Sequence, residues 1–169
     1  MTGLRTGAAG HDPPVDDPRR FSLASACAAA ADDDALARWV GDFLASRGSD
    51  NEVLAAGLAQ QRHWWVGPVL VPIDELIRLA GPEDEARCPI EPEEWEEEVD
   101  AMEESMDDGW EPPPLLAQHQ SGRLLLQDGN HRYEALVRAG GTHAWTLIWF
   151  DDPTDRDEFR RTTSFASAR

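Results

Sequence analysis

The chain has 169 residues, enough for one ordinary hydrophobic core, and 41% of them are hydrophobic. Its formal net charge is −18 and all 15 basic residues are arginine. Such an acidic chain is a poor candidate for a stand-alone DNA-binding module, whose non-specific affinity comes from neutralising phosphates. We see no apolar run of about 18 residues and no signal peptide, and two cysteines are too few for a disulfide framework or a zinc site. We therefore expect a cytoplasmic protein with reduced thiols.

The first part of the chain divides into a tail and a helical extension. Residues 1–20 are rich in glycine, proline and aspartate and are predicted to form a disordered tail. Residues 21–63 are predicted to hold helices, one with an apolar stripe at helical spacing and a second over 51–63. The stripe consists of Leu36, Trp39, Val40, Phe43 and Leu44. These helices could cover a sheet or act as an arm for a partner protein, and the sequence leaves both roles open.

Residues 64–162 are predicted to form a compact α+β domain with a small mixed sheet, and residues 163–169 a frayed end. The first expected elements are a strand over 64–71, a short helix that begins at 72 and ends near 81, a loop over 82–92 and a helix over 93–108. They are followed by a hairpin of strands 115–119 and 123–127, a helix over 131–139, a strand over 144–150 and a helix over 155–162. The helix over 93–108 is the clearest, because its apolar residues share one face and carboxylates fill the rest. That face carries Trp95, Val99, Met102 and Met106.

The stretch 123–140 carries the strongest functional signal. An apolar strand runs through the turn 128–130 into a helix, which leaves several backbone N–H groups unpaired at the helix start. Those amides and the helix dipole together favour an anion. Gly129 lets the backbone come close to a ligand, while His131 and Arg132 place hydrogen-bond donors beside it. The sequence therefore predicts a phosphate site at this turn.

The box 129–135, with the sequence GNHRYEA, resembles the G-x-x-R-x-x-A box of ParB proteins and the G-C-H-R-Y box of sulfiredoxins. The order of elements over residues 66–150 also resembles the ParB N-terminal/sulfiredoxin-like superfamily. The resemblance implies that fold, with nucleotide phosphates held at the helix start. Some members are free amino-acid kinases. It therefore also implies a Mg²⁺-dependent phosphotransferase or NTP hydrolase that uses ATP or CTP, with a small hydroxyl substrate.

Asn130 departs from both boxes. Sulfiredoxins carry a cysteine at this place, and ParB proteins commonly carry a glutamate that assists CTP hydrolysis. Cys88 lies far from the box in the sequence and does not replace that cysteine. We therefore expect neither peroxiredoxin repair nor a ParB-style CTPase.

The predicted nucleotide-binding residues are those of the turn, together with one arginine from the loop before the long helix. They are Asp128, Gly129, Asn130, His131, Arg132 and Arg87. Arg132 is the strongest single candidate, because a guanidinium can grip phosphate with two parallel hydrogen bonds. Its alternative role is a surface salt bridge to Glu134 or Asp128. Arg87 is included only because ParB relatives place a phosphate-facing loop there.

Four residues of the turn and the following helix have candidate roles besides phosphate binding. Glu134, one turn into the helix, could be a general base or simply a solvated residue. His131 is the second catalytic candidate, with donation to phosphate or capping of the turn as its roles. Asp128 could hold Mg²⁺ or be a plain turn residue. Asn130 could cap the helix and still contact a ligand.

These observations lead to competing functional hypotheses. The leading one is a nucleotide-binding protein that acts as a Mg²⁺-dependent phosphotransferase or NTP hydrolase on a small molecule. The alternative is a non-catalytic nucleotide-sensing or protein-interaction module, with the N-terminal helices as the partner surface. A DNA-binding or nuclease function is disfavoured by the acidic charge.

Overall fold

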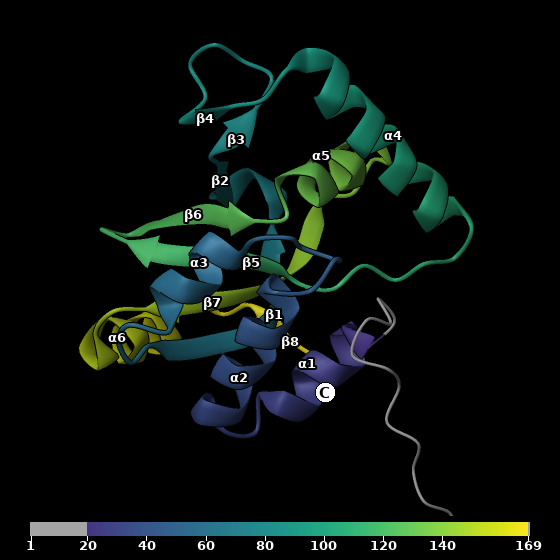
Figure 1. Cartoon of the computed structure of the whole chain (residues 1–169). Helices are drawn as coiled ribbons and strands as arrows, with labels where there is room; N and C mark the ends of the chain where they lie inside the picture. The colour runs from purple at the N-terminus through teal and green to yellow at the C-terminus, as the bar shows by residue number, and fades with distance from the viewer. Residues whose placement is uncertain (1–19, 169) are drawn as a thin grey trace, which may run out of the picture.

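A computed structural model describes residues 20–168 of the chain (Figure 1), so the predicted tail over 1–20 lies outside the described residues except for Arg20. The helices are α1 (Leu23–Ala29), α2 (Asp33–Leu44), α3 (Glu52–Leu58), α4 (Pro92–Asp107), α5 (Asn130–Arg138) and α6 (Pro153–Thr162), with a 3₁₀ turn at Ile73–Glu75. The strands are β1 (Trp64–Pro72), β2 (Leu76–Arg78), β3 (Ala80–Gly81), β4 (Cys88–Pro89), β5 (Leu115–Gln120), β6 (Arg123–Asp128), β7 (His143–Phe150) and β8 (Ala166–Ser167). No helix in this part of the chain is long and apolar enough to cross a membrane.

The central sheet has six strands in the order β2-β6-β5-β7-β1-β8. It is mixed, because β5 with β7 and β2 with β6 are parallel pairs, whereas the β5–β6 hairpin and the β1–β7 pair are antiparallel. Strand β7 has a partner on each side, as expected from its continuous apolar sequence. The predicted α+β class with a mixed sheet is confirmed.

Helices α1, α2 and α3 cover one face of the sheet (Figure 1). Helix α2 buries most of its predicted stripe there, although Trp39 is only partly buried. The sheet contributes Trp65, Leu116, Leu147 and Trp149 to this layer. Each large apolar side chain buried in this way contributes about 1.5–3 kcal/mol to the stability of the fold. Of the two roles left open for the N-terminal helices, the structure therefore shows the cover.

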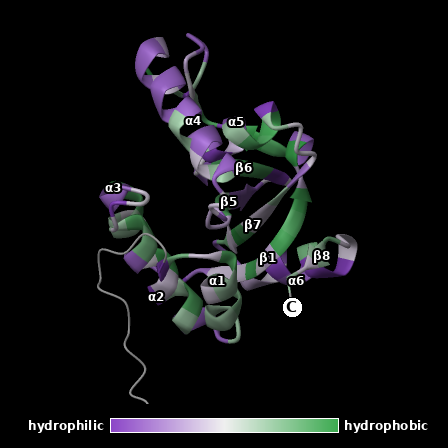
Figure 2. Ribbon diagram, turned by 90° about the vertical axis from the view of Figure 1, so that its right-hand side faces the viewer, coloured by the Kyte–Doolittle hydropathy of each residue, from purple (hydrophilic) through white to green (hydrophobic). Residues whose placement is uncertain are grey.

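Helices α5 and α6 pack on the other face of the sheet, through Tyr133, Leu136 and Phe159. Helix α4 packs on α5 through its predicted apolar face. Trp95 and Val99 are buried in that contact, and the two methionines of the face are partly buried. The rest of α4 is hydrophilic, in contrast to the apolar strands of the sheet (Figure 2).

Several local predictions were wrong. The helix expected from 72 to near 81 is a 3₁₀ turn followed by β2 and β3, because the backbone after the turn pairs with the edge of β6. The loop expected over 82–92 contains β4, which pairs with β3 in a separate small sheet. The end expected to be frayed, 163–169, includes β8, which pairs with β1. Phe165 holds that segment by packing against the core beside Phe159.

Candidate functional site

The turn between β6 and α5 is built around Gly129. Its φ is +92°, and a Cβ at this position would lie 2.7 Å from Leu115 Cδ2 and 2.9 Å from Arg132 Nη2. Both the left-handed backbone and the close packing therefore require glycine. No side chain caps α5, and the first backbone bond of its opening turn runs from the Tyr133 amide to the Gly129 carbonyl, at 2.8 Å. Within residues 20–168, the amides of residues 130–132 are left without a protein acceptor.

The guanidinium of Arg132 is occupied by other groups of the protein. Its side chain is buried, with Nη1 donating to the carbonyls of Pro113 and Pro114 at 2.6 and 3.2 Å and Nη2 donating to Asp128 Oδ2 at 2.6 Å. Burial lowers the pKa of Arg132, and the charge of Asp128 opposes that shift. The two proline carbonyls lie just before β5, and the Arg132 guanidinium donates the hydrogen bonds that they accept. Because the protein itself occupies the guanidinium, this geometry does not favour Arg132 as the group that grips a phosphate.

Asp128 has both carboxylate oxygens engaged by the protein. Oδ2 accepts from Arg132, while Oδ1 accepts from Ser49 Oγ at 2.8 Å and from Asn51 Nδ2 at 3.2 Å. A Mg²⁺ ligand needs a carboxylate oxygen that faces the ion. No group of three or more histidines, cysteines, aspartates or glutamates suited to a metal occurs in the part of the chain that the structure describes. The contacts of Asp128 therefore favour a structural role over the predicted metal role.

Asn130 and His131 lie at the start of α5 but contact different partners. The Asn130 side chain accepts hydrogen bonds from the amides of Leu79 and Ala80 at 3.1 and 3.2 Å, so it fixes the segment between β2 and β3 instead of capping α5. The His131 ring packs on Trp95, with 4.4 Å between the ring centroids. Burial lowers the pKa of His131, which keeps the imidazole neutral at pH 7. Its Nε2 is buried and finds no hydrogen-bond partner among the described residues.

Glu134 lies on the side of α5 that faces Arg78 and Arg138. Its two carboxylate oxygens accept from them, at 3.0 Å from Arg78 and 3.2 Å from Arg138. The Arg78 guanidinium also pairs with Glu83 and lies over the Trp95 ring, 4.8 Å from its centroid. Glu134 is thus a member of a surface ion-pair network, which does not suit the predicted general base.

A pocket of about 210 Å³ opens at the turn, between the loop 48–51 that joins α2 to α3 and the residues 127–132. Ala80 and Met102 complete its wall. Its volume is below the about 300–1,000 Å³ of drug-sized sites, so it fits a phosphate-sized group with the rest of a ligand outside. The turn residues predicted from the sequence do come together here. Glu134 and Arg87 do not line the pocket, and Arg87 is exposed on its own loop.

Comparison with known proteins finds similar folds among solved structures. No family model and no curated protein matches the sequence. Among solved structures, sulfiredoxin from Arabidopsis thaliana is similar over 59% of this chain and 99% of its own, with 16% identity and a TM-score of 0.36. A Pnob8-like ParB-N domain is similar over 60% of this chain, with 18% identity and a TM-score of 0.35, and this chain spans only 35% of that one.

The predicted likeness to ParB/sulfiredoxin-like folds is confirmed. At these identities and TM-scores the likeness concerns the fold alone and carries nothing about ligand or activity.

Sequence reasoning missed the loop that closes the site. Ser49 and Asn51 bind the Asp128 carboxylate from positions 79 and 77 residues earlier in the chain. No local pattern signals such a contact. In the same loop Asn51 caps α3, with its side-chain oxygen accepting from the Leu54 amide at 3.2 Å.

Proposed function

We propose that this chain is a nucleotide-binding module that holds a phosphate at the start of α5 and does not transfer it. The observation that supports this most is the uncapped N-terminus of α5, whose first amides lie at the wall of a phosphate-sized pocket. Backbone amides at a helix start, preceded by a left-handed glycine, are a common way of binding phosphate.

The electrostatics of the pocket favour a nucleotide that brings its own cation. Asp50 and Asp128 both line the pocket, and Arg132 neutralises only the second of them. ATP or CTP would therefore bind as the Mg²⁺ complex, with the ion held by phosphate oxygens and water. In this proposal the amides of residues 130–132 contact the phosphate, and Ser49 and Asn51 keep the opposite wall in place.

The contacts of Glu134 and Asn130 support binding over catalysis. Glu134 is paired with two arginines and lies outside the pocket lining. Asn130 is occupied by the backbone of β3 and the residue before it. Neither side chain is placed to activate water or a hydroxyl group, which a hydrolase or phosphotransferase requires.

Amide signals in a ¹⁵N-labelled sample provide the direct test. Titration with Mg·ATP, Mg·CTP or Mg·GTP should shift the signals of Asn130, His131 and Arg132 before any others. Met102→Trp should weaken binding, because residue 102 lines the pocket, whereas Met106→Trp on the same helix should not. No shift at these amides with any nucleotide at millimolar concentration would overturn the proposal.

Phosphoryl transfer to a small hydroxyl substrate is the second candidate. It is favoured by His131, whose neutral imidazole lines the pocket and has one nitrogen without a partner among the described residues. Such a ring could accept the proton of the attacking hydroxyl. Release of ADP or CDP that depends on a hydroxyl substrate such as L-serine, and that His131→Gln abolishes while nucleotide binding persists, would favour this candidate over a sensor.

A further inference from the structure

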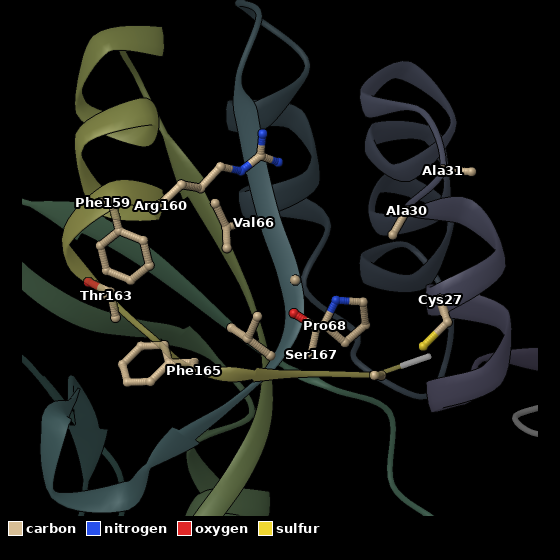
Figure 3. A pocket seen from close by; sticks show the side chains of 13 residues that line it. Cys27, Ala30, Ala31, Val66, Pro68, Phe159, Arg160, Thr163, Phe165 and Ser167 are labelled. Carbon is tan, nitrogen blue, oxygen red and sulfur yellow. The ribbon is translucent and has the colours of Figure 1, made fainter.

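A second pocket lies between α1, α6, the middle of β1 and β8 (Figure 3). Its volume is about 460 Å³, and none of its lining residues is shared with the pocket at α5. This size falls within the about 300–1,000 Å³ typical of sites for small molecules. The proposed nucleotide site makes no use of it.

A bulge in β1 creates the space. The register between β1 and β7 shifts across residues 66–69, which takes the middle of that segment out of the ladder. Gly67 has a φ of +118°, and a Cβ there would lie 2.5 Å from the Thr146 carbonyl oxygen, so the backbone lies directly on β7. On the side of α1 the pocket is lined by the short side chains of Ala30 and Ala31. The hollow is thus a product of the backbone and of small residues.

The walls divide into an apolar and a polar part. Phe159 and Phe165 lie on the side of α6 and β8, and Arg160 extends from α6 towards β1 (Figure 3). Thr163 and Ser167 add hydroxyl groups to the lining. A ligand that suits this pocket has an apolar body and a polar end that accepts hydrogen bonds.

Arg160 gives the pocket its charge. It is the sole charged side chain among the described lining residues, in a chain with a net charge of −18. Its Nη2 donates to the Trp65 carbonyl at 3.0 Å, which holds the guanidinium at the pocket wall and leaves its other N–H groups available. The guanidinium groups of Arg132, Arg138 and Arg156, in contrast, are each paired with a carboxylate.

We propose that this pocket binds a small monocarboxylate with an apolar body. The carboxylate accepts hydrogen bonds from Arg160, whose planar fork matches its two oxygens, and the apolar part packs against Phe159 and Phe165. A single negative charge is expected, because Arg160 is the one charged side chain in the described lining.

The two cysteines provide a built-in reporter for this pocket. Cys27 lines it, whereas Cys88 is exposed on β4 and does not. The rate of alkylation by N-ethylmaleimide would be followed at each cysteine by mass spectrometry of the full chain. Phenylacetate and octanoate should slow the alkylation of Cys27 in a saturable manner and leave Cys88 unchanged. Their neutral counterparts, 2-phenylethanol and 1-octanol, should protect Cys27 at least about tenfold more weakly, since they lose the charge-assisted hydrogen bonds.

Variants of neighbouring arginines complete the test. Arg160→Gln should weaken protection by phenylacetate about tenfold, whereas Arg160→Lys should retain part of it. Arg161→Gln is the matched control and should change nothing, because Arg161 is 72% exposed and lies outside the pocket lining. The proposal is overturned if neither carboxylate protects Cys27, or if the alcohols protect it equally well. The comparison of carboxylates with alcohols uses the chain without substitutions, so it tests the proposal even if Arg160→Gln does not fold.

Discussion

Arg132 and Arg160 illustrate opposite uses of the same side chain. Arg132 lies in the box that resembles a phosphate site, yet its guanidinium is buried and bound to Asp128 and to two backbone carbonyls. Arg160 lies in a helix without any motif, yet its guanidinium borders a pocket and, among residues 20–168, donates to one carbonyl. A motif residue can therefore serve the fold, while a residue without a motif remains available for a ligand.

The largest effect expected from this comparison follows the loss of the buried carboxylate. Asp128→Asn should lower the free energy of unfolding by about 3–5 kcal/mol, because it leaves the buried charge of Arg132 without its partner. Arg160→Gln should cost less than about 1 kcal/mol, since an exposed side chain with one hydrogen bond is removed. Urea unfolding monitored by tryptophan fluorescence measures both.

Glu83→Gln is a suitable control for the removal of a charge, because Glu83 is the half-exposed partner of Arg78. It should lower the free energy of unfolding by less than about 1 kcal/mol. If Asp128→Asn were as mild as this control, Arg132 would not depend on Asp128. The contrast between the two arginines would then be lost, and Arg132 would again be a candidate for phosphate.

The next effect concerns the turn that presents the α5 amides. Gly129→Ala should destabilise the fold by roughly 3 kcal/mol, because it combines a left-handed φ with a Cβ 2.7 Å from Leu115. Gly109→Ala is its matched control, since Gly109 has a φ of +89° but no atom near its missing Cβ. That substitution should cost only about 1–2 kcal/mol. Equal costs in thermal or urea unfolding would show that packing around Gly129 contributes nothing.

A smaller effect is expected at the loop that holds Asp128. Ser49→Ala removes a hydrogen bond to a buried carboxylate and should cost about 1.5–3 kcal/mol. Ser105→Ala, which removes a bond between an exposed serine and a helix carbonyl, should cost less than about 0.5 kcal/mol. Urea unfolding of both variants measures the difference in unfolding free energy from their midpoints, provided that the dependence of this free energy on urea concentration is unchanged.

The smallest effect is a pH dependence that arises from His131. Burial lowers the pKa of His131 in the folded state, so between that pKa and the ordinary value near 6.5 the unfolded chain binds more protons. Stability from this residue is therefore complete above the ordinary value and falls as the pH drops towards the folded pKa. His131→Gln should flatten this part of the curve of unfolding free energy against pH, whereas His143→Gln, at an exposed histidine, should not. Parallel curves for all three proteins would contradict this explanation.

Some features could be predicted from the sequence because their signals are local. The periodicity of α2 and α4, the β5–β6 hairpin and the glycine turn before α5 each depend on residues close together in the chain. The apolar stripe of α2 predicts that one face of this helix is buried, but it does not indicate that the sheet is what the face packs against.

The roles of the site residues could not be predicted, because they depend on distant backbone groups. Arg132 is held by carbonyls at Pro113 and Pro114, which follow an acidic helix and carry no signal of their own. The side-chain oxygen of Asn130 accepts from the Ala80 amide, which lies 50 positions earlier in the chain. Whether a polar side chain serves a ligand or the protein is decided by such contacts, which no local spacing reveals.

The cover formed by α1–α3 has a consequence for how this chain can be divided. A truncated chain starting at Trp64 would keep every strand of the sheet but leave Trp65, Leu116, Leu147 and Trp149 open to water. It would also remove the two side chains that bind Asp128 Oδ1. Such a fragment should aggregate instead of yielding a minimal domain, so the helical extension and the residues from Trp64 onwards are expected to fold as one unit.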